Sequence, residues 1–220
     1  RALDILNEVD LILCEDTRKS RILFNEFNIM TKYDSLHEFT SFKNIEKYVS
    51  FLEEGNSIAL ISDAGTPLIS DPGFEIVKIA KEKNIFVNPL PGPSSVISAL
   101  VGSGLKIDKF IFEGFPPRKK QELENYLKCY LYEERTIVLF ESPRRIKKLV
   151  QSVIEILGKD RNVTLAKEIS KPHQKFISGS SQSLLNKIEK DNNLEKGEIV
   201  FLIEGTKEKS SIEDAEVEIL

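Results

Sequence analysis

The sequence predicts an α/β protein of two domains with mostly parallel sheets. Short runs of Val, Ile, Leu and Phe alternate with longer segments in which apolar residues recur every three or four positions. The short runs are typical of buried strands, and the longer segments are typical of helices that cover a sheet. With 40% hydrophobic and 30% charged side chains among 220 residues, the chain has enough apolar material for a core. This composition excludes a disordered protein.

Two further classes of protein are disfavoured. No apolar run approaches the roughly 20 residues that a membrane span needs, and residues 1–4 lack the cationic and then apolar layout of a signal peptide. We therefore expect a soluble, cytoplasmic protein. Cys14, Cys129, His37 and His173 do not follow zinc-ligand spacing. We expect neither a metal site nor a disulfide scaffold.

Each predicted strand is a short apolar run bounded by polar or turn residues. The strand candidates are residues 9–14, 57–61, 86–90, 110–114, 136–140, 163–167 and 198–203. Segments with helical spacing lie between most of them, as in a sheet whose strands are joined by crossover helices.

Several helices carry start and stop signals. Asp71 followed by Pro72 predicts a capped helix start, and Ser142 followed by Pro143 repeats the pattern. Gly158 supplies a left-handed residue that ends the second of these helices. Another helix is expected to begin at Thr40 or Ser41 and to end at Gly55, with these side chains facing inward: Phe42, Ile45, Val49 and Leu52.

The glycine-rich segment 102–108 separates regions of different charge, so we place the domain boundary there. The predicted domains are residues 1–104 and 105–205, followed by a tail at 206–220. The first domain has 10 Lys and Arg against 15 Asp and Glu, whereas residues 105–171 have 15 against 10. A local basic face can attract a polyanion even though the sequence pI is about 5.5.

The loop at residues 62–73 follows a predicted strand and precedes a predicted helix. Ligands of open α/β sheets bind at the carboxyl ends of strands, and small residues let a backbone approach a ligand closely. Asp63 could accept hydrogen bonds from hydroxyl or amine groups. A turn that ends in a helix cap explains the same residues about equally well. The loop matches neither common phosphate-binding glycine motif.

Two other strand ends resemble this loop in composition. Ser94 and Ser95 open a helix after a Pro-Gly-Pro turn, where backbone amides attract anions, although simple capping explains either serine. Asp16 or Thr17 caps the helix after the first strand in the simplest interpretation, which leaves Arg18 in solvent.

The second domain has a carboxylate beside cations at two strand ends. Glu168 with Lys171 could position and deprotonate a hydroxyl, although such pairs are more often surface ion pairs. The basic residues near positions 118–120 and 144–145 suit phosphate contacts, and a solvated helix start is the ordinary alternative.

Six motifs, taken in order and spacing, closely resemble the bacterial small-subunit (16S) ribosomal RNA cytidine-2′-O-methyltransferases, a branch of the tetrapyrrole methylase superfamily. They are residues 14–18, 62–73, 91–94, 114–117, 140–142 and 167–171. The resemblance covers nearly the whole chain. It implies two tetrapyrrole-methylase-like α/β domains that hold S-adenosylmethionine in the cleft between them, commonly in a homodimer. Family members begin with a further strand and a Gly-Asn-Leu loop, so we expect that this chain starts after them.

The resemblance also implies roles for particular residues. The cofactor residues would be Asp63, Ala64, Gly65, Thr66, Pro67, Ser94, Ser95, Phe140, Ala166 and Glu204. If the substrate is RNA, as the basic excess in residues 105–171 favours, its phosphates would be contacted by Arg118, Lys119, Lys120, Arg144 and Arg145. The catalytic candidates are Glu168, Lys171, Asp16 and Arg18, because all four lie on segments expected to end at the cleft. Glu168 and Lys171 rank first because they lie in the more basic domain. Lys167 stands where an arginine is common, which weakens any bidentate contact there.

Methylases with other substrates would share the same cofactor motifs. A methylase of this superfamily could act on a corrin or porphyrin precursor, or on a modified protein side chain. The basic excess in residues 105–171 favours RNA of the small ribosomal subunit. A ligand-sensing module without catalysis is a weaker alternative, because it would not require the paired polar strand ends.

Overall fold

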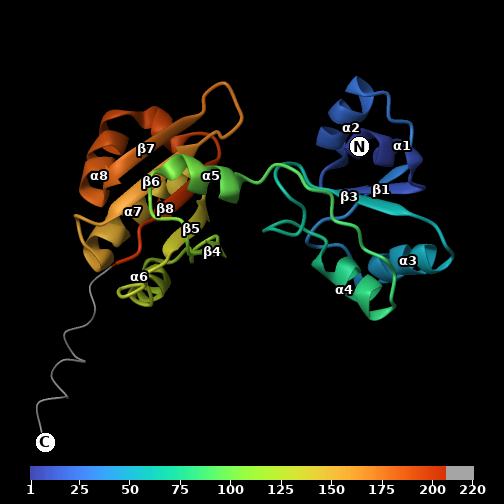
Figure 1. The fold of residues 1–220 in the computed structure, drawn as a ribbon, viewed down its shortest axis with the longest axis horizontal. Helices are drawn as coiled ribbons and strands as arrows, with labels where there is room; N and C mark the ends of the chain where they lie inside the picture. The colour runs from blue at the N-terminus through green and yellow to red at the C-terminus, as the bar shows by residue number, and fades with distance from the viewer. Residues whose placement is uncertain (207–220) are drawn as a thin grey trace, which may run out of the picture. The chain divides into compact units, whose positions relative to one another are not determined.

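The computed structural model describes residues 1–206 and divides the chain into two compact units (Figure 1). The first unit comprises Arg1–Ser94, and the second begins at Ser95. Each unit has its own sheet and its own buried apolar clusters. No helix among these residues has the length and apolar character to cross a membrane.

The first unit is a parallel sheet with helices on both faces. Its strands, in spatial order, are β2 (Tyr33–Ser35), β1 (Leu11–Cys14) and β3 (Ile58–Ile61). The helices are α1 (Ala2–Glu8), α2 (Thr17–Glu26), α3 (Phe42–Glu53) and α4 (Phe74–Glu82). Successive side chains of β1 face opposite ways: Ile12 packs with Leu6 and Phe24 of α1 and α2, and Leu13 with residues of α3 and α4.

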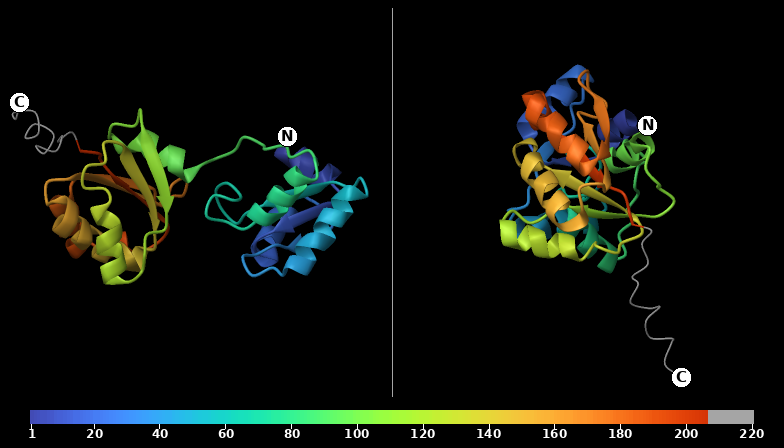
Figure 2. Two further views of the ribbon diagram at one scale, coloured as in Figure 1. Left: turned by 90° about the horizontal axis from the view of Figure 1, so that it is seen from below. Right: turned by 90° about the vertical axis from the view of Figure 1, so that its left-hand side faces the viewer.

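The second unit is a five-stranded sheet that also lies between helical layers (Figure 2). Its strands, in spatial order, are β4 (Phe110–Gly114), β5 (Thr136–Glu141), β8 (Ile199–Ile203), β6 (Asn162–Lys167) and β7 (Lys175–Ser180). One face packs against α6 (Lys120–Lys128), α7 (Pro143–Leu157), α8 (Ser181–Lys190) and the short helix η1 (Asn192–Glu195). The other face packs against α5 (Ser95–Ser103).

The α/β class is confirmed, but only the first sheet is parallel throughout. In the second sheet β4 and β5 are parallel, whereas β5 with β8, β8 with β6, and β6 with β7 are antiparallel. The connection between β6 and β7, residues 168–174, is too short for a crossover. The second sheet is therefore mixed.

The predicted strand at 86–90 is wrong. These residues form no regular element in the structure, and Phe86 is 84% exposed. Apolar composition alone predicted this strand, but a strand also needs an adjacent strand with which its backbone can form hydrogen bonds. The reverse error concerns β2 and β7, whose polar sequences gave no strand signal but which pair with β1 and β6.

The predicted helix ends are partly confirmed. Ser142 is the N-cap of α7 with Pro143 in its first turn, and Gly158 follows Leu157 with φ 98°. The ψ of Gly158 is 150°, so its conformation lies outside the left-handed helical region. The cap of α4 is Gly73 instead of Asp71, because the chain reaches the helix through a φ of 126° that excludes most other residues.

The helix α3 begins after Ser41, and Gly55 follows its end with φ 90°. Of its four expected inward side chains, Ile45 and Val49 are buried and Leu52 is partly buried. Phe42 is 60% exposed, contrary to the prediction. It occupies the first position of the helix.

The units divide between Ser94 and Ser95, not after residue 104. The cause is the packing of α5, which places Val96, Ala99 and Leu100 in one buried cluster with Val138 and Leu202 of the second sheet. The glycines at 102 and 104 therefore lie at the end of a helix of the second unit. The predicted tail at 206–220 lies outside the described residues except for Thr206, whose N–H donates to the carbonyl of Glu133 at 2.7 Å.

Candidate functional site

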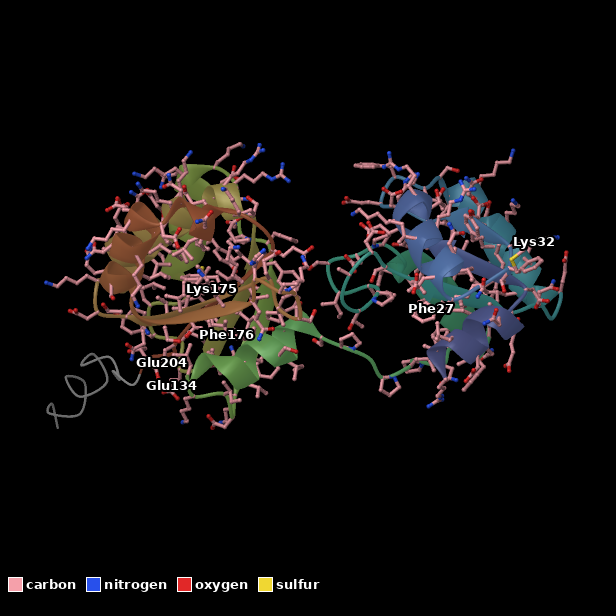
Figure 3. The ribbon with its side chains drawn as sticks, turned by 90° about the horizontal axis from the view of Figure 1, so that it is seen from above. Phe27, Lys32, Glu134, Lys175, Phe176 and Glu204 are labelled. Carbon is pink, nitrogen blue, oxygen red and sulfur yellow. The ribbon has the colours of Figure 1, made fainter. Side chains whose placement is uncertain are left out.

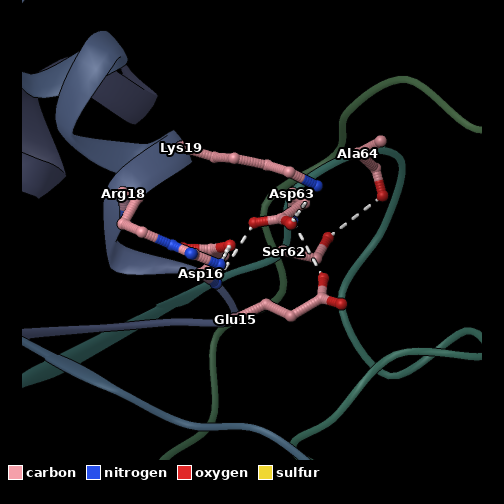
Figure 4. A network of polar contacts seen from close by, with 7 residues as sticks. All are labelled: Glu15, Asp16, Arg18, Lys19, Ser62, Asp63 and Ala64. Carbon is pink, nitrogen blue, oxygen red and sulfur yellow. Dashed lines mark hydrogen bonds and ion pairs between the residues drawn. The ribbon is translucent and has the colours of Figure 1, made fainter.

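Two predicted motifs of the first unit lie side by side because β1 and β3 are parallel neighbours. Cys14 pairs with Ile61 in the last register position of both strands. The loops that follow, 15–18 and 62–73, therefore leave the sheet at the same edge (Figure 4).

Asp63 holds these two loops together. Its Oδ1 accepts a hydrogen bond from the backbone N–H of Asp16 at 3.2 Å, and its Oδ2 accepts one from Lys19 Nζ at 2.8 Å. In return, the N–H of Asp63 donates to Glu15 Oε2 at 3.2 Å (Figure 4). Part of the Asp63 carboxylate is thus already used to fix the edge of the site.

Asp16 is the N-cap of α2, as the simplest interpretation of the sequence predicted. Its carboxylate accepts from Arg18 N at 2.9 Å, and from Arg18 Nε and Nη2 at 3.0 and 2.7 Å. The side-chain hydrogen bonds of Arg18, followed by its backbone N–H, lower the pKa of Asp16. Asp16 is therefore ionised at neutral pH and is a weak base. Arg18 is mostly exposed but is engaged by this pair.

The exposed part of the 62–73 loop has its backbone in unusual conformations. Gly65, Leu68 and Ser70 have φ of 76°, 72° and 65°. Ala64, Gly65 and Thr66 are exposed, and Pro67 is partly buried. Thr66 Oγ1 donates to the carbonyl of Pro93 at 3.1 Å, which ties this loop to the predicted 91–94 motif. The next residues, Ser94 and Ser95, are partly buried, and Ser95 is the first residue of α5.

Carboxylates gather at this edge of the first sheet. Glu15 and Asp63 are joined as described above, and both lie close enough to Asp71 to raise its pKa, although burial is the larger cause. A bound group of positive charge would be favoured beside them. Among residues 1–206, no three His, Cys, Asp or Glu side chains come together as a set of metal ligands.

Glu168 and Lys171 lie together in the second unit, as predicted, on the turn that leaves β6. Lys171 Nζ lies 3.0 Å from Glu168 Oε1 and 3.2 Å from Glu198 Oε2. Glu168 Oε1 also accepts from the N–H of Glu198 at 2.7 Å. That backbone hydrogen bond, followed by the bond from Lys171, lowers the pKa of Glu168.

Phe140 lies near the carboxyl end of β5 against two other aromatic rings. Its ring centroid is 4.9 Å from that of Phe112 and 5.6 Å from that of Phe115. Ala166 is completely buried in the same apolar cluster. Its side chain therefore packs in the core.

Glu204 lies at the other end of the second sheet, which corrects its assignment beside Phe140 and Ala166. Because β8 is antiparallel to both neighbours, Val200 pairs with Phe140 and Ala166, whereas Ile203 pairs with residues at the amino ends of their strands. Glu204 Oε2 accepts from Asn162 Nδ2 at 2.7 Å. Glu204 also lies beside Glu134 (Figure 3).

The predicted RNA contacts differ in how free they are. Arg118 and Arg144 are exposed, whereas Lys119 lies 2.9 Å from Glu122 and Lys120 lies 3.5 Å from Glu124. Arg145 Nη2 lies 3.1 Å from Glu141 Oε2 and donates to the carbonyls of Pro116 and Pro117 at 3.2 and 2.8 Å. Arg145 therefore has a structural role in addition to any contact with a ligand.

The family model described as Tetrapyrrole (Corrin/Porphyrin) Methylases matches residues 1–185. The chain belongs to the tetrapyrrole methylase family. Among curated relatives, the Ribosomal RNA small subunit methyltransferase I of Escherichia coli O157:H7 is 40% identical over 94% of this chain and 72% of its own length. The protein of the same name from Thermotoga maritima is 43% identical over 93% of this chain and 90% of its own length.

Solved tetrapyrrole methylases and related enzymes share the fold at low identity. Diphthine synthase has a TM-score of 0.68 at 16% identity and covers 92% of this chain and 82% of its own. The uroporphyrin-III C-methyltransferase from Thermus thermophilus, complexed with S-adenosyl homocysteine, has a TM-score of 0.60 at 14% identity and covers 92% and 89%. These likenesses support the fold alone.

The sequence does not predict two residues that take part in the contacts described above, Lys19 and Glu198. Lys19 follows Arg18 on α2, and its contact with Asp63 depends on the adjacency of β1 and β3. Glu198 contacts Lys171 because Lys167 and Ile199 pair across β6 and β8. No local pattern signals either contact, since the partners are far apart along the chain.

Proposed function

We propose that the protein is an S-adenosylmethionine-dependent methyltransferase that methylates the ribose 2′-hydroxyl of a cytidine in small-subunit ribosomal RNA. The observation that carries this proposal is the similarity to relatives named Ribosomal RNA small subunit methyltransferase I, at 37–43% identity over 93–97% of the chain. On the same resemblance, its substrate is the small ribosomal subunit, its place of action is the cytoplasm and its active form is a homodimer.

The cofactor contacts that we propose in the first unit are the loop residues Asp63 to Pro67, together with Ser94 and Ser95. The exposed backbone of residues 64–66 allows close approach. The carboxylates of Glu15, Asp63 and Asp71 suit a ligand that carries an amine and a sulfonium. In the second unit we propose Phe140 as a contact and Ala166 as buried support, and we withdraw Glu204.

S-adenosylmethionine supplies the methyl group, and the residues of the chain align and activate the hydroxyl. Displacement at a methyl group is in line, so alignment provides most of the acceleration. A neutral 2′-hydroxyl is a poor nucleophile, so an acceptor for its proton contributes about 10²- to 10⁴-fold. We propose that Glu168 accepts this proton and that Lys171 orients the ribose. Asp16 with Arg18 is the second candidate pair.

Glu168 has room for this role despite its lowered pKa. The hydrogen bonds from Lys171 and Glu198 both reach Oε1, which leaves Oε2 as the oxygen that we propose to accept the proton. The lowered pKa keeps the carboxylate ionised but makes it a weak base. Proton transfer to Glu168 would therefore be concerted with methyl transfer instead of preceding it.

The test is transfer of labelled methyl groups from the cofactor to alternative acceptors. Small ribosomal subunits that lack the modification form one arm, and a tetrapyrrole precursor forms the other. We expect label in the ribosomal RNA, at a ribose that resists alkaline cleavage. Label in the tetrapyrrole alone would contradict the proposal, and cofactor binding without label in any acceptor would favour a ligand-sensing module.

A further inference from the structure

A pocket of about 260 Å³ lies between α6 and α7 in the second unit, apart from the Glu168 turn. Four cationic and two acidic side chains line it, and Leu123 and Leu149 form apolar parts of its wall. The charged residues are Arg118, Lys120, Arg145, Lys148, Glu141 and Glu155. A lining in which cations outnumber carboxylates suits an anionic ligand.

Internal pairs neutralise part of this charge. Lys120 Nζ lies 3.9 Å from Glu155 Oε2, and Arg145 Nη2 lies 3.1 Å from Glu141 Oε2. Arg118 and Lys148 are exposed, and neither has an acidic partner within 4.0 Å among residues 1–206. Arg118 and Lys148 are therefore the two cations of the pocket lining without an ion-pair partner among these residues.

Glu141 makes one cation of this pocket rigid. Its side chain is only 1% exposed, and Oε2 lies beside Arg145 without a hydrogen-bond partner. Arg145 also donates to the carbonyls of Pro116 and Pro117. A guanidinium held on both sides loses little freedom when it binds an anion, so this geometry is preorganised.

We propose that this pocket is a phosphate subsite for the backbone of the RNA substrate. Arg118 and Lys148 contact the phosphate, and Arg145, which is paired with Glu141, is held in a fixed position beside them. The inference rests on the proposed function for its RNA partner. It adds Lys148 to the basic residues assigned from sequence and separates Arg118 from Lys119 and Arg144, which do not line the pocket.

The test measures binding of a fluorescein-labelled, single-stranded, cytidine-containing RNA oligonucleotide to the intact protein over a series of salt concentrations. The variant is Arg118→Ala with Lys148→Ala. The control is Lys128→Ala with Lys159→Ala, which removes the same charge from exposed positions outside the pocket. Circular dichroism and cofactor binding verify that both proteins are folded.

We expect the pocket variant to lower RNA affinity about tenfold per lost contact and to reduce the salt slope by about 0.7 for each one. The control should shift both quantities much less. Equal effects in the two variants would overturn the subsite. Because binding is measured without methyl transfer, this result is independent of the labelling experiment that tests the proposed function.

A second variant removes a negative charge from the pocket and is expected to strengthen RNA binding. Damage to the fold would weaken binding, so it could not produce this result. Glu155 is more than half exposed and partly neutralises Lys120. Glu155→Gln should therefore raise RNA affinity severalfold and steepen its salt dependence. Unchanged or weaker binding would contradict a pocket that recognises negative charge.

Discussion

Asp63 accepts a hydrogen bond from the backbone N–H of Asp16 at 3.2 Å, across the carboxyl ends of two neighbouring parallel strands. This bond joins two motifs that are 47 residues apart in the chain. Because Lys19 binds the other oxygen of the same carboxylate, the position of Asp63 determines the shape of this sheet edge.

Replacing Asp63 by Ala together with Thr66 by Val should weaken S-adenosylmethionine binding about tenfold or more, because both loop anchors are lost. Isothermal titration calorimetry measures the change. Asp10→Ala is the matched control, since Asp10 bonds to Ser57 at the opposite ends of the same strands. Unchanged affinity in the double variant would locate the cofactor elsewhere.

Replacing Glu168 by Gln should lower the single-turnover rate of RNA methylation about 10²- to 10⁴-fold with little change in cofactor affinity. Glutamine can still accept the N–H of Glu198, so the turn should keep its shape. Rapid-quench kinetics with labelled cofactor measure the rate. A wild-type rate in this variant would remove Glu168 from the mechanism and make Asp16 the next group to replace.

Replacing Gly73 by Ala should destabilise the first unit by about 1–3 kcal/mol. Gly73 has φ 126°, and an added Cβ would lie 2.5 Å from Leu60 Cδ2. Gly55→Ala is the control, because Gly55 has φ 90° but nothing within 4 Å of the added atom. Urea unfolding should show the larger loss for Gly73, and equal losses would mean that the contact with Leu60 relaxes freely.

Glu133 should make stability depend on pH in the acidic range. Side-chain hydrogen bonds from Arg135 lower its pKa from 4.5 to about 2. The resulting stabilisation is complete above the ordinary pKa and is lost as the pH falls from about 4.5 towards 2. Urea unfolding at several pH values should show a shallower acid loss for Glu133→Gln than for the wild type. Identical slopes would exclude this contribution.

Local sequence signals determined much of the fold and the family. The apolar runs at β4, β5, β6 and β8, and the Ser142-Pro143 start of α7, depend on burial and backbone chemistry that each segment carries by itself. The motifs at strand ends likewise identified the tetrapyrrole methylase family, which the match over residues 1–185 confirmed.

Only the tertiary structure decided which strands are neighbours and in which direction they run. An apolar run reports burial but not direction, so the antiparallel β8 carries Glu204 to the end of the sheet opposite Phe140. The polar segment β7 forms a strand because β6 supplies its hydrogen-bond partners. The apolar residues 86–90 form no strand. The contacts of Asp63 with Lys19 and of Lys171 with Glu198 have the same origin, because strand pairing brings distant residues together.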